Sequence, residues 1–308
     1  MATVSRVLSG VRPDNDEIAA RVRTAAADLD FRPNPSAQGM RRPVSAVGVI
    51  VPDLANPYFA ELLKGISAAA ENSGRRMLVA DAAENPLEEA RLIRELTRWS
   101  SGLILCSPRM PARQLADVCG AIDRPLVTIN RHTSGRPGVT VDFTAGIRAL
   151  CAHLRDLGHE HIAYVKGPAL SWSDGERRRA LRAEQKRGLR VDFFDGGPGI
   201  TDGHSATDAA LETGATAVVA FSDYVALGIL IRATEIGVRV PEDVSVTGFD
   251  DIPVSRIAGP GLTTATVNKI DLGCRAFELL GETPSDRRVT MKPTLVIRGS
   301  TGRARRRS

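Results

Sequence analysis

Polar and aromatic side chains follow the apolar stretches of this 308-residue sequence at five places. Carboxylates, guanidinium groups and amides hydrogen-bond to hydroxyl groups, and the flat rings of Trp, Tyr and Phe cover apolar ring faces. A small polyhydroxylated molecule needs both kinds of contact. The sequence therefore predicts a site for such a molecule, drawn from Asp53, Asn56, Tyr58, Phe59, Asn130, Arg131, Ser171, Trp172, Asp174, Arg177, Ser222, Asp223, Tyr224, Asp250 and Asp251.

Each of these residues also has an ordinary structural explanation. Asp250 could cap a helix, Asn56 could form a turn with the proline that follows it, and Arg131 could be a solvated loop residue. Their common position favours binding, because ligands of open parallel sheets lie outside the carboxyl ends of the strands.

The stretches that position these residues alternate between buried-strand and helical patterns. A first series has strands at residues 46–53, 76–81, 102–107 and 125–130, with helices at 57–74 and 86–99. A second series begins with a helix at 144–159 and continues with strands at 161–167, 190–194, 217–223 and 244–251. The stretches 265–281 and 293–300 close the chain. This order predicts an α/β fold with two doubly wound parallel-sheet lobes.

Residues 1–43 differ from the two series, since they contain arginine but no lysine. Pro13 suits a helix start, and Ile18, Val22 and Leu29 recur at helical spacing, which predicts an amphipathic helix. Residues 31–43 carry three prolines and are typical of a connector. At the other end, the arginine-rich residues 303–308 are either a solvated end or a non-specific nucleic-acid contact.

The sequence carries no motif typical of an enzyme. No G-x-G-x-x-G follows an apolar run, no G-x-x-x-x-G-K-[ST] is present, and the glycine-rich residues 195–200 lack a phosphate-binding lysine. His159 and His161 are too close for a zinc pair on one helix face, and no serine elbow or Cys–His motif occurs. We therefore expect no catalysis, no cofactor and no metal site.

The composition of the chain indicates where the protein is located in the cell and which partners it can have. Net charge is +5 and the pI is about 9.3, which only weakly suggests an anionic partner. The four cysteines are far apart and form no C-x-x-C, as in reduced proteins. Because there is no basic-then-apolar leader and no run long enough to span a membrane, we expect a cytoplasmic protein without a membrane partner.

Seven segments occur in the order of a known family: residues 2–10 (ATVSRVLSG), 31–40 (FRPNPSAQGM), 47–62 (VGVIVPDLANPYFAEL), 157–168 (LGHEHIAYVKGP), 219–228 (VAFSDYVALG), 240–253 (VPEDVSVTGFDDIP) and 261–269 (GLTTATVNK). With them the chain resembles the LacI/GalR family of bacterial transcription repressors over nearly its whole length. The resemblance implies periplasmic-binding-protein-like lobes preceded by a partial all-α helix-turn-helix headpiece.

The resemblance also implies domain limits. The headpiece and hinge would occupy residues 1–43, and the N-terminal effector lobe residues 44–159 plus 263–288. The C-terminal effector lobe would take residues 160–262 plus 289–302, followed by a basic tail at 303–308.

In that family a recognition helix reads base edges and a short hinge helix wedges a side chain into the minor groove. Met40 stands where the family has a leucine, and Gly39 weakens the hinge helix. The resemblance implies DNA contacts at Ala2, Thr3, Ser5, Arg6, Asn34 and Met40. The first helix of the motif has no counterpart; either Met1 is internal to a longer native chain or the headpiece is truncated.

For the effector, the resemblance implies contacts at Tyr58, Phe59, Arg131, Trp172, Arg177, Ser222 and Asp250. Asn130 replaces a usual aspartate and Ser222 a usual asparagine, so the identity of the sugar stays open. The implied function is a homodimeric regulator, a repressor of a palindromic double-stranded operator, controlled by a small sugar-like effector. The alternatives are a sugar-binding protein, or an effector-binding remnant that does not bind DNA.

Overall fold

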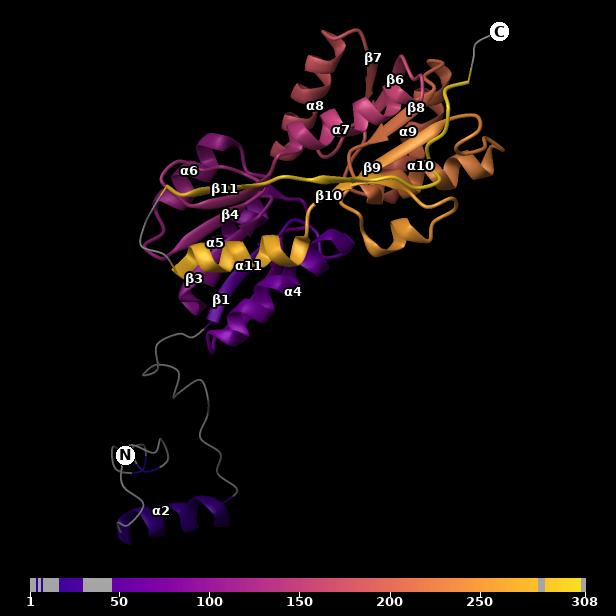
Figure 1. Ribbon diagram of the computed structural model, residues 1–308. Helices are drawn as coiled ribbons and strands as arrows, with labels where there is room; N and C mark the ends of the chain where they lie inside the picture. The colour runs from indigo at the N-terminus through magenta and orange to yellow at the C-terminus, as the bar shows by residue number, and fades with distance from the viewer. Residues whose placement is uncertain (1–3, 5–6, 8–16, 30–45, 282–285, 306–308) are drawn as a thin grey trace. The chain divides into compact units, whose positions relative to one another are not determined.

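The computed structural model describes Val4, Val7 and residues 17–29, 46–281 and 286–305 (Figure 1). The chain divides into two compact units, residues 1–45 and 46–308, and each is described by itself. In the first unit, α2 (Glu17–Asp28) confirms the predicted helix, but the apolar residues predicted to share one face are not buried. Ala19 is buried, whereas Ile18 and Leu29 are 46% and 79% exposed. The predicted DNA contacts Ala2, Thr3, Ser5, Arg6, Asn34 and Met40 lie outside the described residues.

The first lobe of the larger unit is a parallel sheet with the order β11-β5-β4-β3-β1-β2. Its strands are β1 (Ala46–Val51), β2 (Arg76–Asp81), β3 (Gly102–Cys106), β4 (Leu126–Ile129), β5 (Gly138–Val141) and β11 (Arg288–Met291). Its helices are α4 (Pro57–Asn72), α5 (Pro86–Trp99), α6 (Ala112–Gly120) and α11 (Lys269–Gly281). In Figure 1, α11 runs alongside α4 although the two are far apart in the sequence.

The second lobe has the sheet order β12-β10-β9-β8-β6-β7, parallel except for β12. Its strands are β6 (His161–Val165), β7 (Arg190–Phe194), β8 (Ala217–Ala220), β9 (Ser245–Phe249), β10 (Thr263–Thr266) and β12 (Thr294–Val296). Its helices are α7 (Phe143–Asp156), α8 (Trp172–Gln185), α9 (Ile200–Glu212), α10 (Asp223–Glu235) and the 3-10 helix η1 (Pro253–Arg256).

Burial explains the strand sequences. The central strands are covered on both faces, so their residues are apolar without alternation, as in the fully buried β3 and β8. In the first lobe, Val49 faces Leu62 of α4, whereas Ile50 faces the opposite layer with Ile93 of α5. Two parallel sheets, each covered on both faces, confirm the predicted α/β fold.

The chain crosses between the lobes at residues 141–143, 266–269 and 291–294. The limits expected at residues 263 and 289 are wrong. Strand β10 was expected in the first lobe but pairs in the second sheet, and β11 was expected mostly in the second lobe but pairs in the first sheet. Helix α7, expected in the first lobe, packs on the second: Arg155 pairs with Glu184 of α8 at 2.6 Å. The limits differ because a strand belongs to the lobe of the strand with which it forms hydrogen bonds: β10 pairs with β9, and β11 pairs with β5.

The described start of the basic tail is anchored on the second lobe. The amide of Ala304 donates to the Leu157 carbonyl at 2.8 Å, and Arg305 lies 3.3 Å from Asp243. The backbone of the described tail is therefore fixed at Ala304, while Arg303 and Arg305 are exposed to solvent as the charge run predicts. Among the described helices, none is long and apolar enough to cross a membrane.

Candidate functional site

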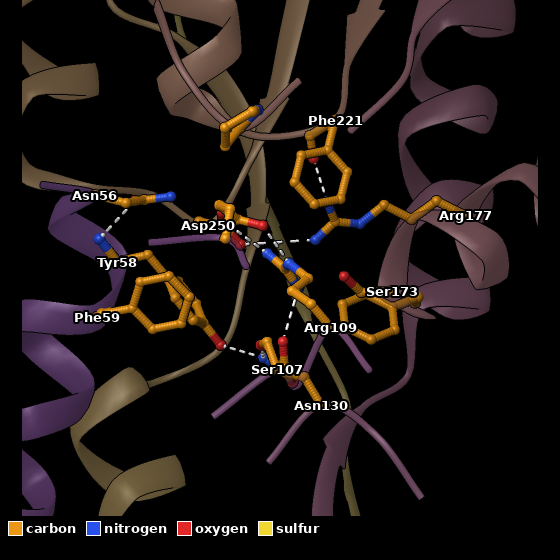
Figure 2. Close-up of a pocket in the computed structure, with 13 residues that line it drawn as sticks. Asn56, Tyr58, Phe59, Ser107, Arg109, Asn130, Ser173, Arg177, Phe221 and Asp250 are labelled. Atoms are coloured by element: carbon orange, nitrogen blue, oxygen red, sulfur yellow. Dashed lines mark hydrogen bonds and ion pairs between the residues drawn. The ribbon is translucent and has the colours of Figure 1, made fainter. Parts of the chain in front are cut away.

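A small cavity lies where the carboxyl ends of the two sheets face each other (Figure 2). Its volume is about 30 Å³, close to the share of one water molecule in the liquid. Its walls come from both lobes: Asn56, Tyr58, Phe59, Glu84, Ser107, Arg109, Asn130, Phe143, Ser173, Arg177, Pro198, Phe221 and Asp250. Ligand pockets measure roughly 300–1,000 Å³, so the lining side chains leave little free space between the lobes here.

The start of α4 supplies the first wall. The side chain of Asn56 caps the helix by accepting from the Tyr58 amide at 3.0 Å, which turns Tyr58 and Phe59 toward the cavity. The hydroxyl of Tyr58 accepts from Asn130 Nδ2 at 2.7 Å. Burial raises the pKa of Tyr58, so its hydroxyl keeps a proton to donate.

Arg177 of α8 is the central cation of the second lobe. It is 3% exposed, and its guanidinium carbon lies 4.9, 4.4 and 4.1 Å from the ring centroids of Phe143, Phe221 and Phe249. One terminal nitrogen donates to the Phe221 carbonyl, but Nε has no hydrogen-bond partner. Cation–π contacts therefore hold the group in place while a buried donor stays available.

Asp250 follows β9 and faces Arg177, with the closest nitrogen and oxygen 3.8 Å apart. Burial raises the pKa of this carboxyl to about 7, although the nearby Arg177 charge lowers it. Its backbone has a φ of 117°, a value that is rare outside glycine, so the surrounding contacts must hold it. Asp250 can thus act as donor or acceptor near neutral pH.

An ion pair forms the wall of the first lobe. Arg109 donates from Nε and Nη2 to the two oxygens of Glu84 at 2.5 and 2.9 Å, and from Nη1 to the Ser107 carbonyl. Buried Glu89 accepts from the Arg109 and Met110 amides and so fixes the loop that carries Arg109. Figure 2 shows Arg109 among the residues that line the cavity.

Four of the seven predicted effector contacts line this cavity: Tyr58, Phe59, Arg177 and Asp250. The other three lie behind the lining. Arg131 donates to the Pro108 carbonyl at 2.9 Å, and Ser222 caps α10 by accepting from the Val225 amide. The Trp172 ring stands edge-on to His132 and Phe143. These three residues support the wall rather than form it.

The sequence analysis missed seven of the lining residues: Glu84, Ser107, Arg109, Phe143, Ser173, Pro198 and Phe221. The strand-end rule could have found Glu84 and Arg109, because they follow residues 76–81 and 102–107, but no candidates were taken after those runs. Phe143 follows β5, a strand that the sequence analysis did not predict.

Known proteins share this architecture. A family model described as a periplasmic binding protein-like domain matches residues 151–301. Two solved structures cover most of the chain and, at this identity, show the shared fold: a Lac repressor dimer bound to operator and an anti-inducer (TM-score 0.81, 24% identity, 98% of this chain and 95% of that one), and a LacI family regulator from Enterococcus faecium with bound ribose (TM-score 0.73, 24%, 84% and 100%). The fold and its cavity thus define a two-lobed ligand-binding protein of the periplasmic-binding-protein type.

Relatives in sequence identify the family within this class of two-lobed proteins. The HTH-type transcriptional repressor CytR of Escherichia coli is 30% identical over 97% of this chain and 92% of its own length. The ribose operon repressor of Halalkalibacterium halodurans is 28% identical over 91% of this chain and 85% of its own. The chain belongs to the LacI/GalR family of transcriptional regulators.

Proposed function

We propose that this protein is a transcriptional repressor whose affinity for a palindromic operator is controlled by a small sugar-like effector in the cavity. The observation that carries the proposal is the cavity itself: donors, acceptors and aromatic rings from both lobes converge in a chain related to repressors throughout its length. In this proposal the protein acts as a regulator rather than as an enzyme, and it works in the cytoplasm, where it meets DNA.

The charges of the lining favour an uncharged effector. Glu84 neutralises Arg109 in a two-point pair, and Asp250 faces Arg177. A ligand carboxylate or phosphate would find Arg109 already paired with Glu84 and would be repelled by Asp250 whenever that carboxyl is ionised. Hydroxyl groups can instead bond to the free Arg177 Nε and to the unpartnered Asn130 Oδ1, while the phenylalanine rings cover an apolar face.

The closed cavity also explains how an effector could act. A space of about 30 Å³ cannot admit a sugar until the lobes or their side chains move. The effector therefore binds an arrangement of the lobes or of the lining side chains that differs from the one seen here. A ligand that prefers one arrangement shifts the population toward it, and that shift can change operator affinity.

An exposed apolar groove on the second lobe supports a homodimer, and the edge strand β2 also exposes two apolar side chains. On the edge strand β2, Leu78 and Val79 are 36% and 38% exposed. On the second lobe, Ile231 is 45% exposed in an apolar groove lined also by Leu227, Leu230, Val254, Ala258 and Pro260. Such surfaces mark protein contacts, and a two-fold dimer matches the symmetry of a palindromic operator.

Calorimetric titration of the purified chain with neutral pentoses and hexoses tests the effector site. We expect Arg177→Ala to abolish the binding of any sugar that the wild type binds. Arg179→Ala is the matched control, because Arg179 lies on the same helix with its side chain 74% exposed. Unchanged affinity in Arg177→Ala would remove the cavity from the proposal. Sugar binding with no affinity for any DNA from its own locus would favour the sugar-binding alternatives.

A further inference from the structure

Lys269, the first residue of α11, is buried, and its ammonium group contacts three oxygen atoms. The residue is 6% exposed, and Nζ donates to the carbonyls of Asp250 and Asp251 at 2.6 and 3.2 Å. The same nitrogen lies 2.9 Å from Glu61 Oε2. A lysine is almost never buried unless it is paired, so these three oxygens account for its position.

The three oxygens belong to different lobes. Asp250 and Asp251 follow β9 in the second lobe, whereas Glu61 lies on α4 in the first. Lys269 itself stands at the crossing from β10 to α11. Its ammonium group therefore joins a loop of one lobe to a helix of the other, at the point where the chain passes between them.

The loop of the second lobe needs such contacts. Asp250 and Asp251 have φ values of 117° and 53°, in the region that favours glycine. Backbone in this region persists only where neighbouring groups hold it. The Asp250 carbonyl accepts from Thr266 Oγ1 at 2.8 Å as well as from Lys269, and both donors come from the crossing segment.

The helix of the first lobe carries the opposite wall of the cavity. Glu61 lies one turn beyond Tyr58 on α4. One ammonium group thus contacts the segment that presents the Asp250 carboxyl and the segment that presents Tyr58 and Phe59.

We propose that Lys269 is a positioning residue: an interlobe latch that holds the Asp250 loop against α4 and keeps the cavity closed. Opening the lobes for an effector then requires the ammonium group to leave the two carbonyls or Glu61. The latch follows from contacts within this chain, and only its consequence for effector binding rests on the proposed function.

Hydrogen exchange of the full chain without any ligand tests the latch. In Lys269→Met we expect the Asp250 and Ile252 amides, which are bonded to Ala265 and Asp223, to exchange at least tenfold faster relative to the amides of β6. A merely structural loss of stability would speed exchange in β6 and in the loop together. Lys269→Arg, which keeps the charge and the donors, should restore at least part of the protection.

Arg275→Met is the matched control, because Arg275 lies on the same helix with its side chain 54% exposed. It should leave the loop unchanged. If Lys269→Met does not fold, Glu61→Gln carries the test, with an expected increase of at least threefold in the same loop amides. The latch is overturned if the loop amides of the tested variant exchange, relative to the amides of β6, at the same rate as in the wild type. Since no sugar or DNA is needed, this outcome is separate from the test of the proposed function.

Discussion

Asp250 shows how one residue joins stability to binding. Its carboxyl is held in a strained loop, shielded from water, and faced by a guanidinium group at 3.8 Å. Burial raises the pKa of this carboxyl more than the Arg177 charge lowers it, so the pKa is about 7 instead of its ordinary value. The residue best suited to bind a sugar hydroxyl therefore also weakens the fold when it is ionised.

This conflict predicts a pH dependence. Between the ordinary pKa of an aspartate and about 7, the folded state holds a proton on Asp250 that the unfolded state has lost, so the contribution of this group to stability falls as pH rises. Asp250→Asn lacks this loss. We expect its free energy of unfolding, relative to wild type, to rise by roughly 1–4 kcal/mol between pH 4 and pH 8. Urea denaturation at both pH values measures the difference, and parallel pH profiles would contradict it.

The Arg109–Glu84 pair gives a second residue-scale prediction. Glu84→Gln leaves a largely buried guanidinium without its carboxylate, since the Arg109 side chain is 7% exposed. We expect a loss of about 1–3 kcal/mol in the free energy of unfolding. Glu88→Gln, which breaks the exposed pair with Arg91, serves as the control and should leave stability unchanged. Equal stability of the two variants would show that Arg109 finds other partners.

Sequence reasoning reached the site only in part. Tyr58, Phe59, Arg177 and Asp250 were predictable because the sequence places them after strands and the resemblance assigns them to the effector. Arg131 and Ser222 also follow strands, but their side chains turn to a backbone carbonyl and to a helix cap. The direction of a side chain at a strand end depends on neighbours that the local sequence does not specify.

At the element scale, α4 and α11 lie unusually close. A Cβ built on Gly65 would meet the Ile270 carbonyl oxygen at 2.1 Å, and one on Gly273 would meet the Leu62 carbonyl oxygen at 2.4 Å. This contact lets helices from opposite ends of the lobe share one face of the first sheet. It also places Glu61 beside Lys269 at the crossing.

Two glycine substitutions test this packing. Gly65→Ala should lower the free energy of unfolding by about 1–3 kcal/mol, because backbone must move to admit the methyl group. Gly175→Ala on α8, where nothing lies within 4 Å, should instead raise it by about 0.5–1 kcal/mol. Chemical denaturation of both variants gives the comparison, and a gain in Gly65→Ala would contradict the close packing.

The order of elements was largely predictable because strand and helix periods differ clearly in this sequence. Strands β5, β10 and β11 were not, because each has four residues and no long apolar run. Strands β5 and β11 lie at one end of the first sheet, where pairing across the chain rather than local pattern decides the structure. The lobe limits near residues 263 and 289 depended on this same long-range pairing.

At the scale of the whole molecule, assembly depends on apolar surface that one copy leaves exposed. We expect Ile231→Lys to convert dimers to monomers in sedimentation experiments, because a charge in the groove opposes its burial. Leu170→Lys is the control, because Leu170 is 47% exposed and lies outside that groove. Dimers that persist in Ile231→Lys would place the interface elsewhere.

Coupling between the cavity and DNA is the central claim, and fluorescence anisotropy measures it directly. Labelled duplexes from the DNA flanking its own gene would be titrated with the full chain, with and without a sugar that calorimetry shows to bind. The account predicts at least a roughly fivefold change in Kd on adding the sugar, lost in Arg177→Ala and kept in Arg179→Ala. An operator affinity that is the same with and without every sugar that binds would contradict it.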